Sequence, residues 1–166
     1  MPIKTYFISD DTYVLEKKLL EVAIQKASET HKVDKNLLKA LIEHESHNEQ
    51  YARRYDYKPL SKQLWFSNAM KQHGFKGEEY FYSIGYTQIL YIVAIVQYGF
   101  KGSAYELYDP IVNIDIGARH LAWNLKRYGG DIEKALSSYN AGSYTESNRE
   151  SYINIVMKLY KKYKEE

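Results

Sequence analysis

The chain has 166 residues, with 23 lysines and arginines, 21 aspartates and glutamates and no cysteine, so its net charge at pH 7 is only +2. A balance this close to neutral gives no reason to expect a nucleic-acid partner, and the length suits one domain with its own core. The absence of cysteine excludes disulfides and thiolate metal sites.

Tyrosine is the unusual part of the composition, with 18 residues against 5 phenylalanines and 2 tryptophans. Tyrosines at a protein surface can stack on flat ligands, sugars included, while their hydroxyls stay hydrogen-bonded. Tyrosines can equally fill a half-buried core, and we expect that role for most of them.

The first predicted element is an amphipathic helix that begins at Asp10 or Asp11 and runs to about Ser28. Its large apolar residues recur at helical spacing and are expected to face inward: Leu15, Leu19, Leu20, Val22 and Ile24. Residues 1–13 lack the charged start and apolar run of a secretion signal, so we expect no signal peptide.

A second helix over residues 36–48 carries the first candidate for chemistry. Asp34 is a good N-cap, and the leucines and isoleucine among residues 38–42 mark an apolar face. At about 100° per residue, Glu45 falls within about 20° of the centre of that face, whereas Glu43 falls about 150° away. We therefore expect Glu43 to face water and Glu45 to face the packing partner of the helix.

A carboxyl group taken out of water holds its proton longer, because its charged form is disfavoured. Glu45 would then suit the role of a general acid in glycosidic or acyl chemistry. The alternative is a glutamate at a helix end that has already turned to solvent, because Glu is rarely buried.

The middle of the chain, residues 51–83, is the least regular part and is crowded with aromatic and charged residues. A helix from Ser61 to about Gln72 is predicted there. The most apolar run, residues 89–96, is too short to span a bilayer and is expected to be a helix buried on all sides.

Cap residues divide the C-terminal half into three predicted helices. Asp109 followed by proline begins a long one, Asp131 begins another that ends near Gly142, and the last covers about residues 148–164. No strand pattern and no internal repeat is visible. We predict an all-α fold of six or seven helices.

His44 and His47 flank Glu45 in a pattern close to that of a zinc protease helix. That motif needs two histidines four residues apart, whereas these are three apart and no third ligand is indicated. We therefore predict no metal site and no cofactor.

Four short motifs follow one another along the chain: Glu45 with Ser46, Gly-Tyr-Thr-Gln at residues 85–88, Ser-Tyr-Asn-Ala-Gly at residues 138–142, and Tyr152 before an apolar last helix. In this order they resemble the lytic transglycosylase (SLT) family, whose signatures are Glu-Ser, Gly-Leu-Met-Gln, Ala-Tyr-Asn-Ala-Gly and a tyrosine in the last helix. The resemblance implies a lysozyme-like fold, close to goose-type lysozyme, and cleavage of peptidoglycan.

By this resemblance, Glu45 is the single general acid and base, and Tyr152 hydrogen-bonds it. The family cleaves between N-acetylmuramic acid and N-acetylglucosamine and leaves an anhydro-muramyl end, with help from the substrate's own acetamido group instead of a second carboxylate. The resemblance covers roughly residues 32–163 and leaves residues 1–31 outside the motifs of a single domain that spans 1–166.

Five further residues acquire expected roles from the same resemblance. Gln88, Tyr139 and Asn140 would line the groove and bind the acetamido and hydroxyl groups of the sugar. Ser46 would place a hydroxyl beside the acid, and Gly85 would stand where a side chain would obstruct the glycan.

The chain departs from the family pattern at two of the motifs. Tyr86 and Thr87 replace the Leu-Met of the second motif, and Ser138 replaces the first alanine of the third. Because the family's methionine lies against the bound sugar, the replacement leaves the shape and preference of that subsite open.

Two other functions stay open at this stage. A lysozyme-type muramidase would need a second carboxylate, for which Asp56, Glu78 and Glu79 are the candidates in the middle segment. A glycan-binding or virion structural module could keep the fold and lack the activity.

Residues 48–56 and 107–129 resemble a phage and prophage branch of the family. This implies a protein that acts on the bacterial cell wall without membrane insertion, carried in a virion or released by a route other than Sec. The expected partners are peptidoglycan glycan strands and other proteins of a virion or a secretion apparatus.

Overall fold

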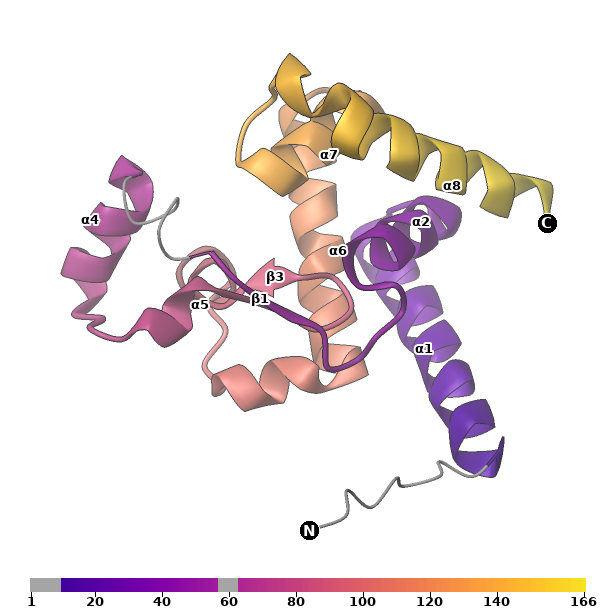
Figure 1. Ribbon diagram of the computed structural model, residues 1–166, viewed down its shortest axis with the longest axis horizontal. Helices are drawn as coiled ribbons and strands as arrows, with labels where there is room; N and C mark the ends of the chain where they lie inside the picture. The colour runs from indigo at the N-terminus through magenta and orange to yellow at the C-terminus, as the bar shows by residue number, and fades with distance from the viewer. Residues whose placement is uncertain (1–9, 57–62) are drawn as a thin grey trace, which may run out of the picture.

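The computed structural model describes residues 10–56 and 63–166, with the backbone alone described for residues 10–13. The described part forms seven α-helices, a small sheet and short 3-10 or π-helical turns (Figure 1). In chain order these are α1 (Asp10–His31), α2 (Lys35–Ser46), β1 (Arg53–Tyr55), α4 (Leu64–His73), η1 (Glu78–Phe81), β2 (Tyr82–Ile84), β3 (Ile89–Leu90), α5 (Tyr91–Tyr98), η2 (Ala104–Tyr108), α6 (Pro110–Arg127), α7 (Ile132–Ala141), η3 (Glu146–Asn148), η4 (Arg149–Ile153) and α8 (Asn154–Glu165). The predicted helical fold is confirmed.

Helix α6 runs through the middle of the molecule and organises the other elements around it (Figure 1). Helices α1 and α7 pack against α6, and α8 lies along α2. The sheet, α4 and α5 form a second group on the other side of α6 (Figure 1). No helix in the described ranges is both long enough and apolar enough to cross a membrane.

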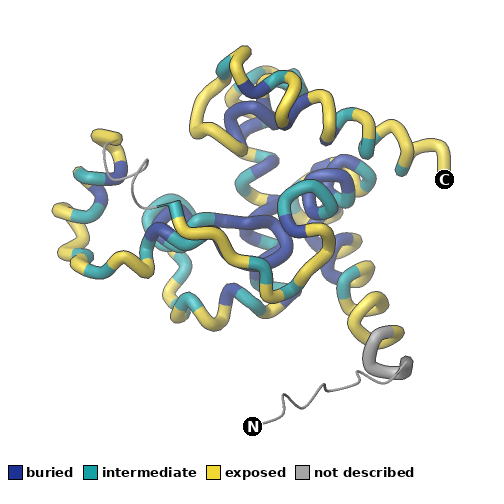
Figure 2. Tube along the Cα trace, in the orientation of Figure 1, coloured by how far each residue is buried: buried dark blue, intermediate teal, exposed yellow. Residues whose placement is uncertain are grey.

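Two apolar clusters form the core, one on each side of α6. The larger cluster joins α1, α2, α6, α7 and α8 and includes Leu38, Leu41 and Leu136, all with no exposed surface. The smaller cluster joins the sheet, α4 and α5 around Phe81 and Ile92. Figure 2 shows both as buried stretches beneath exposed outer turns. The boundary between the clusters is where a groove can form.

Aspartate side chains fix the starts of three helices, as predicted. The Asp34 carboxylate accepts hydrogen bonds from the backbone of Asn36 and Leu37 at 2.8 and 3.2 Å. Asp109 does the same at the start of α6, with proline in the first helical position, and Asp131 does so at the start of α7. These side chains satisfy backbone N–H groups that have no partner inside the helix.

The prediction for the first helix is wrong in one respect. Leu15, Leu19 and Val22 are 64%, 43% and 58% exposed, and only the stripe that includes Ala23 and Ile24 is buried. The helix carries two apolar stripes, and its neighbours α2 and α6 cover just one of them. Figure 2 shows α1 as largely exposed along residues 14–22.

The sheet is the part of the fold that the sequence did not predict. Its three antiparallel strands have only three, three and two residues, and every residue of β1 is exposed. Segments this short cannot display a two-residue hydrophobic period. The apolar run at residues 89–96 is also divided: its first two residues form β3, and in α5 only Ile92, Val93 and Ala94 are buried. The predicted start of a helix at Ser61 lies outside the described residues, and α4 begins at Leu64.

Candidate active site

Glu45 lies in the last turn of α2 and accepts a hydrogen bond from the Tyr152 hydroxyl. Tyr152 belongs to η4, a single π-helical turn that leads into α8 and leaves the tyrosine 4% exposed. A π-helical turn adds a residue to the helix and so changes where the following side chains point, and such turns often occur at functional sites. The His44 ring packs edge-on against Tyr152 with 4.7 Å between ring centroids. The carboxyl group is therefore held by a buried donor.

The surroundings of Glu45 favour its protonated form. Burial raises the pKa of this carboxyl to about 7, the Tyr152 hydrogen bond and the nearby Arg54 charge lower it in part, and Asp56 raises it. Glu43, two residues earlier, was expected to face water, but α8 packs along α2 and the Tyr163 hydroxyl donates a hydrogen bond to it. The burial of Glu45 makes it a carboxyl group that can hold a proton near neutral pH.

Glu45 lies in the wall of a small cavity of about 50 Å³ between the sheet and the helices. Its other lining residues are Arg54, Ser83, Gln88, Ile89, Leu90, Val93, His120, Tyr139 and Asn140. The structure thus brings Gln88, from the turn before β3, together with Tyr139 and Asn140 of α7 beside the acid. Ser46, the residue after the acid, does not line this cavity: its side chain is buried and its hydroxyl donates to the Ile42 carbonyl at 3.0 Å.

A second cavity of about 690 Å³ adjoins the first and shares His120, Tyr139 and Asn140 with it. Both tryptophans of the chain line this larger cavity, Trp65 from α4 and Trp123 from α6, with 45% and 43% of their surfaces exposed. Exposed indole rings in a cavity offer flat surfaces to a ligand. The sequence analysis missed them, although their rarity in a tyrosine-rich chain was a signal.

His120 joins the two cavities and was also missed. Its Nδ1 lies 2.6 Å from the Tyr98 hydroxyl, and its ring stacks on Trp123 with 6.2 Å between centroids and 6° between planes. Burial lowers the pKa of His120 to about 4, so the ring is neutral at ordinary pH. His120 therefore adds no positive charge beside Glu45.

The turn between β2 and β3 places Gln88 in the first cavity. Gly85 and Gln88 both have positive φ, +73° and +47°. The Gln88 amide donates to the carbonyls of Ala52 and Gly85 at 3.0 and 2.9 Å, so its position is fixed by the backbone. A Cβ on Gly85 would lie 2.4 Å from the Asn113 side chain. The close approach of Asn113 is therefore one reason for a glycine at position 85.

Thr87, at the place of the family's methionine, points into the protein. Its side chain has no exposed surface, its hydroxyl donates to Asn113 Oδ1 at 2.8 Å, and its carbonyl accepts from the Tyr139 hydroxyl at 2.8 Å. Tyr86 is likewise buried in the larger apolar cluster. Residue 87 therefore lines neither cavity around Glu45.

We predict that Asn113→Ala will lower the unfolding free energy by about 3 kcal/mol, because it leaves buried partners on three segments unpaired. Asn113 donates to the carbonyls of Ile84 and Leu107 and accepts from the backbone and hydroxyl of Thr87. Asn124 is the control: equally buried on the same helix, it makes one bond, to the His120 carbonyl, and its Oδ1 has no partner in the described ranges.

Urea denaturation of the two variants measures how much unfolding free energy each one loses. Asn124→Ala should cost about 1 kcal/mol or less. Equal losses for the two variants would show that the Asn113 bonds do not hold the Gln88 turn.

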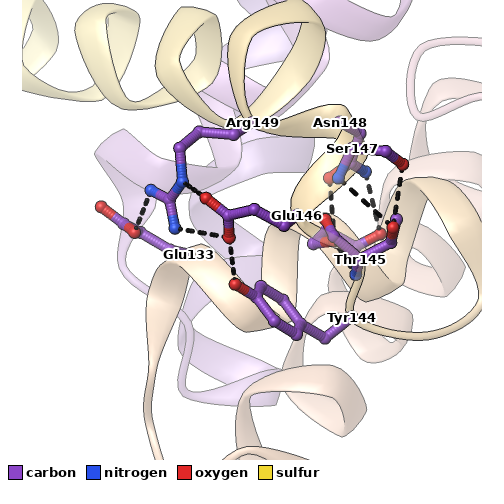
Figure 3. A network of polar contacts seen from close by, with 8 residues as sticks. Glu133, Tyr144, Thr145, Glu146, Ser147, Asn148 and Arg149 are labelled. Atoms are coloured by element: carbon purple, nitrogen blue, oxygen red, sulfur yellow. Dashed lines mark hydrogen bonds and ion pairs between the residues drawn. The ribbon is translucent and has the colours of Figure 1, made fainter.

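The segment after α7 connects Asn140 to the turn that carries Tyr152. Asn140 Oδ1 accepts from Asn148 at 3.3 Å. Arg149, the first residue of η4, pairs with Glu133 of α7 at 2.8 Å and with Glu146, which also accepts from Tyr144 (Figure 3). These charges are partly exposed, so each ion pair adds little stability. Together they define where η4 meets α7.

Of the three candidate second carboxylates, one lies near the acid. Asp56 accepts from Arg54 Nε at 2.9 Å and from Ser83 at 3.3 Å, and both of those residues line the first cavity. Glu78 and Glu79 lie in η1 and line neither cavity around Glu45. Within the described ranges no three histidine, aspartate or glutamate side chains are grouped so that they could hold a metal ion.

A mainly helical domain with a small sheet and a buried acid at the end of a helix is lysozyme-like in class. The chain belongs to the Transglycosylase SLT domain family, whose model matches residues 22–158, from within α1 to within α8. This membership implies lytic transglycosylase activity on peptidoglycan. No solved structure shows a significant match to the chain.

Proposed function

We propose that the protein cleaves the bond between N-acetylmuramic acid and N-acetylglucosamine in peptidoglycan and forms an anhydro-muramyl end, with Glu45 as its only general acid and base. The observation that carries the proposal is the carboxyl itself. Burial raises its pKa to about 7, Tyr152 orients it, and it faces a cavity that opens into a larger one with two tryptophans. A general acid works best when its pKa lies near the operating pH.

In the first step the protonated Glu45 donates its proton to the glycosidic oxygen, and the bond from that oxygen to the anomeric carbon breaks. The carbonyl oxygen of the substrate's acetamido group bonds to the anomeric carbon, so no second carboxylate is needed. The leaving sugar departs with the proton. Glu45 is left as a carboxylate, stabilised by the Tyr152 hydroxyl.

In the second step the Glu45 carboxylate takes the proton of the muramyl sugar's primary hydroxyl. That oxygen bonds to the anomeric carbon, the bond from the acetamido oxygen breaks, and an anhydro ring closes. Glu45 is protonated again for the next cycle.

Three residues beside Glu45 would bind the sugar. The Gln88 amide hydrogens are used by the backbone, so its carbonyl oxygen is left to accept from the substrate. The Tyr139 hydroxyl is bonded to Thr87 and buried, so its ring forms a wall against the sugar. Asn140 is exposed at the rim and keeps its amide hydrogens for the acetamido carbonyl. The indole rings of Trp65 and Trp123 would carry the next sugar units.

The alternative reaction is hydrolysis of the lysozyme type, and Asp56 is the observation that favours it. Its charge is close enough to raise the pKa of Glu45, so it is the carboxylate that could activate water. Its pairing with Arg54 argues against that role, because the bonds with Arg54 and Ser83 occupy its oxygens.

Mass spectrometry of the soluble fragments released from purified peptidoglycan separates these reactions. Anhydro-muramyl ends that disappear with Glu45→Gln are the expected result. Reducing muramyl ends would replace the proposal with hydrolysis and direct attention to Asp56. No fragments, with the protein still sedimenting with the wall, would make it a binding module.

The proposed place of action is the bacterial cell wall. The motifs of the phage and prophage branch support a protein of phage or mobile-element origin that opens the wall locally, carried with a virion or a secretion apparatus. Binding to peptidoglycan from several hosts would identify the wall on which it acts.

A further inference from the structure

A third cavity, of about 740 Å³, lies apart from the two around Glu45 and shares no lining residue with them. Its walls come from α1, the connection between α2 and β1, β1, η2 and the start of α6: Leu19, Gln50, Tyr51, Arg53, Tyr105, Tyr108, Asp109 and Pro110. Tyr51 and Tyr105 are among the most exposed large side chains of the described residues, at 71% and 84%. The proposed mechanism uses none of these residues.

Three tyrosines form one continuous surface in this cavity, here named the tyrosine ledge: Tyr51, Tyr105 and Tyr108. Tyr108 is the central ring, with its centroid 5.6 Å from that of Tyr51 and 6.1 Å from that of Tyr105. The ledge is held by polar contacts beneath it. Gln50 donates to the Tyr108 carbonyl at 3.0 Å, and a Ser103–Glu106 capping box fixes the start of η2. The rings are therefore arranged before any ligand binds.

Arg53 extends the ledge along β1. Its guanidinium lies 5.3 Å from the centre of the Tyr82 ring, which packs on Tyr55 with 4.9 Å between centroids. Arg54, the next residue of the strand, lines the cavity of Glu45. Because successive side chains of a strand point to opposite faces, the ledge and the catalytic cavity lie on opposite faces of β1.

The chemistry of this cavity fits a glycan better than other ligands. Exposed rings match the apolar faces of sugars, and the polar rim of Gln50, Arg53 and Asp109 matches their hydroxyl and amide groups. One cation and one carboxylate give no excess of charge for a polyanion. The aromatic surface also lacks the rows of aliphatic side chains that an amphipathic helix would require.

We propose that the tyrosine ledge is a second binding site for a glycan strand of peptidoglycan, separate from the site of cleavage. The identity of the polymer rests on the proposed function. The wall presents many strands at once, so a protein that holds one strand on the ledge keeps a high local concentration of others at Glu45. The ledge would then retain the protein on the insoluble wall between cleavage events.

The test measures binding of the inactive Glu45→Gln protein to purified peptidoglycan by sedimentation, with and without Tyr51→Ala and Tyr105→Ala. The double change should raise the dissociation constant at least about tenfold, because one of two linked binding sites is lost. Tyr51→Phe with Tyr105→Phe keeps the rings and should keep most of the binding. Leu15→Ala is the control, because it shortens another large apolar side chain that is mostly exposed but lies outside the cavity.

Glycan strands freed of stem peptides by an amidase identify the ligand, and they should compete for the ledge. With Glu45 restored, the double variant should cleave short soluble strands at the normal rate, which also shows that it is folded. Unchanged binding to the wall, a loss of cleavage of short strands, or competition by stem peptides alone would each overturn the proposal. If the unaltered protein releases no anhydro-muramyl fragments, the proposed function fails and the binding comparison still decides the ledge.

Discussion

Glu45→Gln should lower kcat/KM on peptidoglycan by at least about 10²- to 10⁴-fold, the range typical of a single general acid or base. Glutamine keeps the shape of the side chain and can still accept from Tyr152, but it has no proton to donate to the glycosidic oxygen. The release of anhydro-muramyl fragments, followed by mass spectrometry, measures the loss. Glu43→Gln is a matched control, because it alters a carboxylate on the same helix that is also bonded to a tyrosine of α8.

The same substitution should stabilise the protein at alkaline pH. The pKa of Glu45 is about 7 in the folded protein, against 4.5 for an ordinary glutamate, so the folded state holds a proton that the unfolded chain releases. The stability that this proton confers is complete below pH 4.5 and is lost as the pH rises through about 7, which costs about 3 kcal/mol at higher pH. Glu45→Gln removes that cost.

Urea denaturation at pH 5 and pH 8.5 tests this expectation, with Glu43→Gln beside it. The Glu45→Gln protein should gain stability relative to the unaltered protein at pH 8.5 and little at pH 5. Near-normal activity of the variant would mean that Glu45 is not the general acid. Equal effects on stability at both pH values would mean that the pKa of Glu45 is not raised in the folded protein.

Much of the site could be predicted because local physics determined it. The helical phase of residues 38–42 placed Glu45 toward the packing partner, and in the structure the residue is half-buried and accepts from Tyr152. The aspartate caps at positions 34, 109 and 131 were also found, because a side chain that accepts from its own helix needs no distant partner. The order of the motifs then predicted four further site residues: Gln88, Tyr139, Asn140 and Tyr152.

The rest depended on contacts between distant segments. His120 and Trp123 lie on one face of α6, but nothing in that helix shows that α4 and α7 leave the face open. Likewise, only the fold reveals that Gly85 makes room for Asn113, which is 28 residues further along the chain. The prediction that all apolar residues of α1 face inward was wrong for the same reason, because periodicity marks an apolar stripe but does not say whether another helix covers it.

Tyr152→Phe should lower kcat about 10- to 100-fold and move the alkaline limb of the pH–activity profile to higher pH. The hydroxyl stabilises the charged form of Glu45, since a hydrogen bond to a carboxylate contributes about 1.5–3 kcal/mol. Its loss leaves burial as the main influence, so the pKa of Glu45 rises above 7. The acid then keeps its proton at higher pH, but the carboxylate needed for ring closure is less stable and less well oriented.

Tyr163→Phe is the matched control for this pH profile. Tyr163 lies on α8, the helix that follows the η4 turn of Tyr152, and donates to Glu43 on α2, so its loss breaks a tyrosine–glutamate bond to the same helix α2 without touching the acid. Its pH profile should match that of the unaltered protein, whereas the Tyr152→Phe profile shifts. If both variants lower the rate alike and neither moves the alkaline limb, Tyr152 supports only the packing of α8 on α2. A shift confined to Tyr152→Phe means that this hydroxyl sets the pH at which Glu45 gives up its proton.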